Sequence, residues 1–255
     1  MFVCLIALLT VSGAVRSTPL FAQGVKELRV AAAADLQPVM PVFAALYEKK
    51  TGVKLVVSVG SSGTLTTQIL NGAPIDVFLG ADFTFPEKIV AAGLSDMKAP
   101  TPYAKGTLVL WARKDSPLQP ISLEKVESTE MKSLAIADEL HAPYGRAAVA
   151  ALQKLKVYDA MKSRLVMAEN VAQAGQFAES GNAQAGLISL TLASSAHFKE
   201  VGTYVLVPTV TYPEIRQCAV VLKTDRKVEG QKFLDWLLSS EVQGHLKDIG
   251  LAPVR

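Results

Sequence analysis

The sequence has few of the residues from which disulfide-rich, metal-binding or nucleic-acid-binding proteins are built. Its 255 residues include 2 cysteines and 3 histidines, and 19% of them are charged. His141, His197 and His245 lie far apart and show no metal-ligand spacing. The formal net charge is only +3, and no run of Lys and Arg is interleaved with aromatic residues. Nucleic acid is therefore not expected as a partner.

Long hydrophobic runs are absent after residue 23, but an apolar segment precedes it and predicts export. Residues 2–14 are almost wholly apolar, and so short a stretch fits a signal peptide better than a membrane-spanning helix. Ala22 is a plausible cleavage position, so residues 1–22 are assigned to a signal peptide and the mature chain to the periplasm. The alternatives are a short membrane anchor and a buried first element. The mature protein is expected to be soluble.

The motifs of common enzymes are missing as well. Cys4 lies in the segment that would be removed, which leaves Cys218 as a single cysteine, expected to be buried in a strand. The chain has no Gly-x-Ser-x-Gly elbow, and no Gly-Lys-Ser/Thr follows Gly60. Asp76 and Asp82 could act as paired carboxylates, but structural and helix-capping roles are favoured. An enzyme is therefore not expected.

Strand patterns alternate with helix patterns along the rest of the chain, and this alternation predicts α/β layers. The expected strands are 27–34, 53–59, 75–79, 107–112, 134–137, 185–190, 204–207 and 218–222. The expected helices cover about 35–51, 64–70, 86–92, 145–156 and 227–246, and Asp35 is expected to cap the first of them. The pattern occurs twice, so we expect two Rossmann-like α/β lobes joined by a hinge. The first comprises 24–104 with 217–255 and the second 105–216, with a ligand cleft between them.

Four strand ends in this pattern are candidate ligand sites, because α/β sheets bind ligands beyond the carboxyl ends of their strands. They are residues 33–35, 60–63, 142–145 and 186–189. The first three run directly into helices, whose first N–H groups attract anions. Taken alone, residues 60–63 are equally explained as a strand–helix turn with a Ser cap, and residues 31–34 as close packing of helix on sheet.

Several motifs in order give the chain a resemblance to a known family. They are VAAAADL (30–36), GSSGTL (60–65), GAPIDVFLGAD (72–82), PYG (143–145), ENV (169–171) and AGLIS (185–189). Together they resemble the periplasmic molybdate-binding proteins of ABC transporters, which have the type II periplasmic binding protein fold. The resemblance covers essentially the whole mature chain. It implies a monomeric binding protein that captures molybdate, and tungstate as well, for a membrane permease.

The resemblance also implies a ligand set of neutral hydroxyl and backbone N–H groups. Carried over by motif, this set is Ser62, Ser61, Ala34, Asp35, Tyr144, Val171 and Ser189, with Tyr144 and Val171 acting through their backbone. No cofactor is implied, and molybdenum is expected only as part of the bound oxyanion. Neutral donors suit a desolvated dianion because fixed N–H and O–H groups give charge-assisted bonds and select for size.

Two of these residues depart from the family pattern. Asp35 stands where the family often has Ser, and Ser189 stands where it often has Tyr. A carboxylate facing a dianion would repel it, so we expect Asp35 to turn back and cap its helix; the alternative is that it helps to bind a cation. Ser189 is shorter than Tyr and needs closer lobes or a bridging water to donate.

Other ligands and other roles remain possible from the residues alone. Sulfate, phosphate or a ferric complex could occupy such a cleft, although ferric sites usually recruit tyrosines and no adjacent Tyr–Tyr pair is present. The preference for molybdate over sulfate rests on the resemblance. An intracellular sensor with the same lobes is disfavoured by the export segment.

Overall fold

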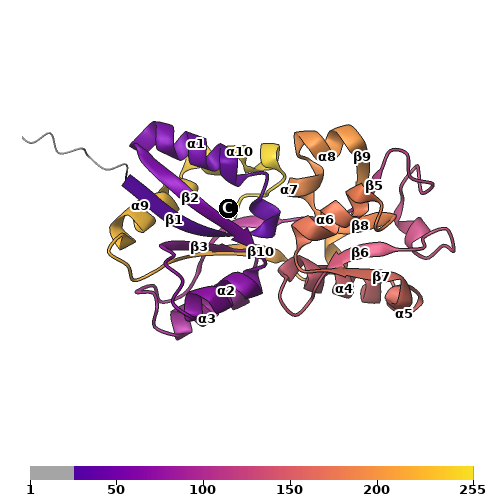
Figure 1. The fold of residues 1–255 in the computed structure, drawn as a ribbon, viewed down its shortest axis with the longest axis horizontal. Coiled ribbons are helices and arrows are strands. Elements are labelled where there is room, and N and C mark those ends of the chain that lie inside the picture. The colour runs from indigo at the N-terminus through magenta and orange to yellow at the C-terminus, as the bar shows by residue number, and fades with distance from the viewer. Residues whose placement is uncertain (1–25, 255) are drawn as a thin grey trace, which may run out of the picture.

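The computed structural model describes residues 26–254, which form two α/β lobes lying side by side, each with one five-stranded sheet (Figure 1). The first sheet has the strand order β2-β1-β3-β10-β4. Its strands are β1 (Lys26–Ala33), β2 (Val53–Gly60), β3 (Val77–Gly80), β4 (Thr101–Gly106) and β10 (Ile215–Val221). The predicted signal peptide, residues 1–22, lies outside the described residues.

The second sheet repeats the arrangement of the first with a different part of the chain. Its order is β7-β6-β8-β5-β9, built from β5 (Leu108–Arg113), β6 (Leu134–Ala137), β7 (Leu165–Ala168), β8 (Ala185–Ser189) and β9 (Gly202–Leu206). In each sheet three parallel strands adjoin an antiparallel pair. The chain crosses between the sheets from β4 to β5 and from β9 to β10. The expected fold class, two Rossmann-like lobes joined by a hinge, is confirmed.

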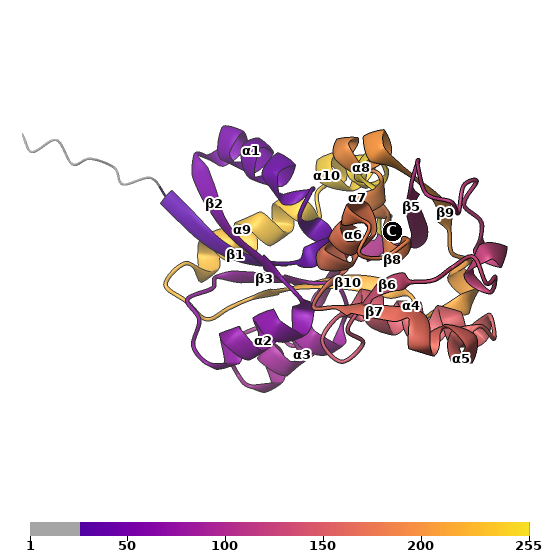
Figure 2. The same ribbon diagram turned by 45° about the vertical axis from the view of Figure 1, so that its right-hand side comes forward.

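Helices cover both faces of the first sheet, as Figures 1 and 2 show. One face carries α1 (Met40–Thr51), α9 (Lys227–Leu237) and α10 (Ser240–His245), and the other carries α2 (Ser62–Leu70) and α3 (Thr84–Ala91). Leu28 and Val30 of β1 pack with the first group, whereas Ala31 packs with the second. This alternation follows the two-residue period of a strand, and burial on both faces explains why these strands are almost wholly apolar.

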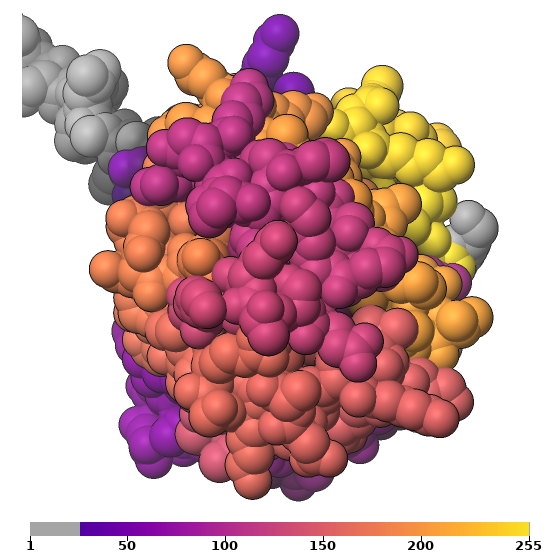
Figure 3. Space-filling view, turned by 90° about the vertical axis from the view of Figure 1, so that its right-hand side faces the viewer, coloured from indigo at the N-terminus to yellow at the C-terminus, as the bar shows by residue number. Residues whose placement is uncertain are grey.

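The second lobe has one large core around its sheet. The long helices α4 (Pro143–Lys154) and α6 (Val171–Ser180) pack on it, together with the short α5 (Tyr158–Met161), α7 (Leu190–Ala193) and α8 (Ala196–Val201). Figure 3 looks onto the outer end of this lobe, where the magenta segment between β5 and β6 forms the centre and upper part of the surface.

The predicted strands are confirmed, but the structure corrects two predicted helices and adds two strands, β4 and β7, and four α-helices, α5 to α8. The predicted C-terminal helix, 227–246, breaks at Leu238, and Ser239 caps the separate α10 by accepting from Val242 N–H. The helix predicted from residue 35 begins only at Met40, after a 3-10 turn, η1 (Ala34–Leu36). Pro41 lacks the N–H group that a continuous α-helix starting after Asp35 would need there.

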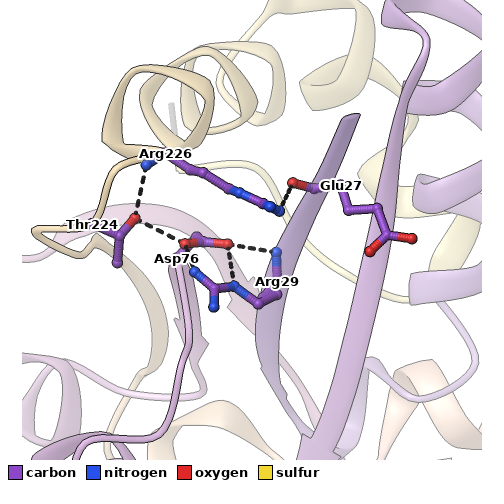
Figure 4. A network of polar contacts seen from close by, with 5 residues as sticks. All are labelled: Glu27, Arg29, Asp76, Thr224 and Arg226. Carbon is purple, nitrogen blue, oxygen red and sulfur yellow. Dashed lines mark hydrogen bonds and ion pairs between the residues drawn. The ribbon is translucent and has the colours of Figure 1, made fainter. Parts of the chain in front are cut away.

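A buried carboxylate in the first lobe joins β1 to the segment before α9 (Figure 4). Asp76 accepts hydrogen bonds from Arg29 N–H at 2.9 Å and from its guanidinium at 2.7 and 2.9 Å. Thr224 Oγ1 donates to the same carboxylate at 2.8 Å, and the neighbouring Arg226 donates to the carbonyl oxygen of Glu27. The predicted structural role of Asp76 is confirmed.

Two further sequence predictions are confirmed by the fold. Asp82 caps α3, since its Oδ1 accepts from Phe85 N–H at 3.0 Å. Cys218 is buried in β10, and burial raises the pKa of its thiol to about 12. Over residues 26–254, no helix combines the length and the apolar character that crossing a membrane requires.

Candidate functional site

Three helices begin around one small cavity where the two lobes meet. They are α2 of the first lobe and α4 and α6 of the second. The cavity has a volume of about 10 Å³, far below the roughly 300–1,000 Å³ of sites for drug-sized ligands. It is lined by Ala33, Ala34, Asp35, Ser61, Ser62, Ala81, Ala142, Pro143, Tyr144, Asn170 and Val171. Such a site can hold only a compact guest.

The strand registers explain why these segments meet. In the first sheet Ala33 pairs with Gly60, so the segments after β1 and β2 emerge side by side. In the second sheet Ala137 pairs with Ala168, which places the segments leading to α4 and α6 together. Ala33 and Ala34 are buried, and their small side chains let backbone groups line the cavity directly.

The helix starts supply backbone donors. Ser62 and Val171 are the first residues of α2 and α6, and Tyr144 is the second of α4 after Pro143. The first N–H groups of a helix have no acceptor within the helix and lie at the positive end of its dipole. Asn170 accepts from the N–H groups of the second and third residues of α6, at 3.0 Å each. The side chain of Asn170 therefore caps α6 without accepting from the N–H of Val171.

The two serines of the second loop have different tasks. Ser61 caps α2 by accepting from Thr64 N–H at 3.1 Å, and its own hydroxyl donates to Thr64 Oγ1 at 2.7 Å. Ser62 Oγ accepts from Ala81 N–H at 3.1 Å, which leaves its hydroxyl proton free to donate. Ser61 therefore makes the predicted cap, and Ser62 lines the cavity with a hydroxyl proton that can donate.

Asp35 does not cap a helix, which corrects the expectation for this residue. The η1 turn has no side-chain cap; the carboxylate of Asp35 instead faces the hinge and the second lobe. Its Oδ2 accepts from Tyr144 Oη at 3.3 Å and from Gln217 Nε2, while its backbone oxygen accepts from Thr191 Oγ1 at 2.6 Å. The cause is the 3-10 turn, because it leaves Asp35 five residues away from the first residue of α1.

Gln217 and Tyr103, on the two hinge strands, complete a buried polar chain that the sequence did not reveal. Tyr103 Oη donates to Gln217 Oε1 at 2.7 Å, and both side chains are fully buried. Gln217 lies in β10 where the pairing with β4 shifts register, and such irregularities re-aim side chains. A glutamine preceding an apolar strand was the only signal of its role, and pairing with Asp35 could not be inferred from it.

Asp35 is fully buried without a cationic partner, and this changes its acidity. Burial raises the pKa of its carboxyl to about 7, although hydrogen bonds from Gln217, its own backbone and Tyr144 act in the opposite direction. Burial also raises the pKa of Tyr144 and Tyr103 well above that of an ordinary tyrosine, so both hydroxyls keep their protons. The chain of contacts is therefore neutral apart from Asp35 itself.

Six of the seven predicted ligand residues line the cavity, and Ser189 does not. Ser189 Oγ caps α7 through Leu192 N–H at 3.3 Å and shares a 2.7 Å hydrogen bond with Thr191 Oγ1. Thr191 in turn holds the backbone of Asp35. The structure therefore places Ser189 behind η1, where it supports that turn.

The cavity has no cationic lining within the described part of the chain. Arg146 lies outside it, pairs with Asp82 across the lobes and stacks on Phe85, with 5.1 Å from its guanidinium carbon to the ring centroid. No cluster of His, Cys, Asp and Glu able to hold a metal ion occurs among residues 26–254. Helix starts and a hydroxyl in a nearly dry cavity are suited to an anion whose oxygens accept hydrogen bonds.

The comparisons define the class of protein. Residues 28–252 match the model of the bacterial extracellular solute-binding protein family, and the chain belongs to this family. Two lobes with a ligand cavity at their junction are what a protein of this class requires.

Within that family the chain is similar to molybdate-binding proteins. It is 36% identical to the molybdate-binding protein ModA of Rhodobacter capsulatus over 88% of this chain and 87% of the relative. It is 38% identical to ModA of Azotobacter vinelandii over 88% and 89% of the two chains. The solved structure of the periplasmic molybdate-binding protein of Azotobacter vinelandii superposes with a TM-score of 0.84 at 31% identity, covering 89% of this chain and all of the other.

Proposed function

We propose that this protein captures molybdate, and also tungstate, and delivers it to the membrane permease of an ABC importer. One observation carries the proposal: the N-termini of α2, α4 and α6 and the Ser62 hydroxyl surround a compact cavity that no Lys or Arg among the described residues lines. The similarity to molybdate-binding proteins along nearly the full chain supports the choice of ligand.

The donors act through geometry as much as through charge. Each backbone N–H or hydroxyl bonded to an anion is stronger than a neutral hydrogen bond, and several together replace the hydration shell of a dianion. Because the donors belong to both lobes, the ligand stabilises the closed arrangement of the lobes. The permease would then distinguish loaded from empty protein by lobe closure.

The remaining features of the proposal follow from this role. The protein acts in the periplasm as a monomer after removal of residues 1–22, and it binds its ligand without altering it chemically. Residues 24–104 with 217–255 form one moving lobe and residues 105–216 the other. In the cavity, Ser62, Ser61, Ala34, Asp35, Tyr144 and Val171 surround the oxyanion, and Ser189 supports them from behind.

A thermal-shift screen tests the ligand directly. Molybdate, tungstate, sulfate, phosphate and Fe³⁺ are added separately to the mature protein, because a ligand that binds the native state raises its melting temperature. We expect shifts with molybdate and tungstate and much smaller shifts with the others. Equal shifts with sulfate and molybdate would refute the specificity, and a shift with Fe³⁺ alone would refute the oxyanion site.

A further inference from the structure

The Asp35 carboxyl is the feature of the cavity that its proposed function leaves unexplained. It lines the cavity with none of its surface exposed. Two donors, Tyr144 Oη and Gln217 Nε2, converge on its Oδ2, whereas its Oδ1 is buried without a hydrogen-bond partner. A buried oxygen without a partner is costly, so one is expected to serve a purpose.

No charge near Asp35 compensates for an ionised carboxylate. The elements packed against η1 are β2, α6 and α7. The titratable groups on them are Lys54 of β2, paired with Glu27, and Glu179 of α6, paired with His197; α7 has none. The groups facing the carboxyl from the hinge side and from α4 are the neutral Tyr103, Gln217 and Tyr144, described above.

We propose that Asp35 is a neutral carboxylic acid in the closed, loaded protein and that its Oδ1–H donates a hydrogen bond to the captured oxyanion. This inference rests on the proposed function. Two hydrogen bonds already occupy Oδ2 as an acceptor, so the proton belongs on Oδ1. A protonated carboxyl has one O–H donor, which satisfies the unpartnered oxygen and removes the repulsion that an ionised Asp35 would exert on a dianion.

Protonation couples ligand capture to pH. At pH 8 most Asp35 carboxyls of the empty protein are ionised, and binding of the anion draws one proton from solvent onto Oδ1. No bond of the anion is broken. Already without an anion, burial raises the pKa of Asp35 to about 7, and a dianion nearby raises it further. Affinity is therefore highest at low pH and falls as the pH rises above the pKa of the empty protein.

Titration calorimetry from pH 6 to 9, in buffers of different ionisation enthalpy, measures both affinity and proton uptake. The proteins are the wild type, Asp35→Asn and Asp96→Asn, each titrated with molybdate and with tungstate. Asn is the uncharged isostere of the acid, and its amide keeps one acceptor and one donor. Asp96 is the control because its carboxylate pairs with Lys223 and Lys227 inside the first lobe and does not line the cavity.

We expect the wild type to take up about one proton per anion at pH 8 and to lose up to roughly ten-fold in affinity per pH unit above pH 7. Asp35→Asn takes up no proton and binds almost equally from pH 6 to 9, while Asp96→Asn keeps the wild-type pH slope. Binding by the wild type without proton uptake, or a hundred-fold loss in a folded Asp35→Asn, would overturn the role of Asp35. If Asp35→Asn fails to fold, the proton uptake measured for the wild type decides whether a carboxyl is protonated on binding. If none of the proteins binds either anion, the proposed function itself is refuted.

Discussion

Gly106 and Tyr144 are packed so closely that a Cβ atom on Gly106 would lie 2.1 Å from the Tyr144 hydroxyl. Gly106 ends the hinge strand β4, whereas Tyr144 belongs to the first turn of α4 in the other lobe. The absence of a side chain at residue 106 therefore allows the Tyr144 hydroxyl to reach Asp35. This close approach joins the hinge to the cavity, as does the hydrogen bond from Gln217 to Asp35.

Replacing Gly106 with Ala should displace Tyr144 and weaken ligand binding. We expect at least about a ten-fold loss of affinity, corresponding to the loss of a hydrogen bond in a closed site. The control is Gly244→Ala, because a Cβ at that helical position meets nothing within 4 Å and Ala favours helix by up to about 1 kcal/mol. Calorimetry with molybdate compares the two; equal affinities would show that the close approach has no bearing on binding.

Ser62→Ala should weaken binding because it removes a hydroxyl donor from a charged ligand. The expected loss is about 1.5–3 kcal/mol of binding free energy. Ser61→Ala instead removes the cap of α2 and should cost about 0.5–2 kcal/mol of stability, with little change in affinity because the Ser61 hydroxyl already donates to Thr64. If calorimetry shows that Ser62→Ala binds molybdate with unchanged affinity, the Ser62 hydroxyl does not donate to the ligand and serves only as the acceptor for Ala81 N–H.

Arg146→Met should speed ligand release without unfolding the protein. Arg146 joins Asp82 and the Phe85 ring of the other lobe, so these contacts exist only while the lobes are closed. A partly exposed pair of this kind is expected to change the dissociation rate by roughly two- to five-fold. Lys223→Met is the control, since Lys223 pairs with Asp96 inside the first lobe. Stopped-flow exchange of molybdate for tungstate measures the dissociation rate of both variants. Identical rates would contradict a role of Arg146 in holding the lobes closed.

Asp76→Asn should destabilise the first lobe and leave the cavity unaffected. Burial alone would raise the pKa of Asp76, but hydrogen bonds from Arg29 and Thr224 outweigh it and the pKa lies below its ordinary value. Asp76 therefore stabilises the fold above the unfolded-state pKa of about 4, and this contribution is lost as the pH falls through the lower folded-state pKa. Denaturant unfolding should show a loss of about 2–4 kcal/mol at pH 7 and a smaller loss at pH 3. If the loss of unfolding free energy were equal at pH 7 and pH 3, an ionised Asp76 could not be the source of the stability.

Asp35→Asn should have the opposite effect on stability without ligand. The folded-state pKa of Asp35 is raised to about 7, so the wild type is penalised once the unfolded chain ionises above about pH 4. The advantage of the Asn variant should grow from pH 4 to pH 7 and then level off, reaching about 2–4 kcal/mol. Thermal unfolding across this range measures it, and a constant difference would mean that Asp35 ionises in the folded protein as it does in the unfolded chain.

Much of the architecture could be predicted from local patterns. Apolar runs such as 27–34 and 218–222 are long enough to identify strands, and their alternation with helical segments defines the α/β class. The strands β4 and β7 were missed because their six and four residues carry too little pattern. The start of α1 was misplaced because a good capping residue, Asp35, precedes two prolines, and a capping preference alone does not show which turn the backbone will adopt.

The sequence by itself determined three of the loops that line the cavity, residues 33–35, 60–63 and 142–145, because small residues and serines at strand ends stand directly before helices. Only the tertiary structure decided what Asp35 does. Its partners, Tyr144 and Gln217, are 109 and 182 residues away along the chain, and their approach depends on lobe closure and on the register shift in β10. Local propensity carries no information about contacts at such separation, since they arise when distant surfaces pack and exclude water.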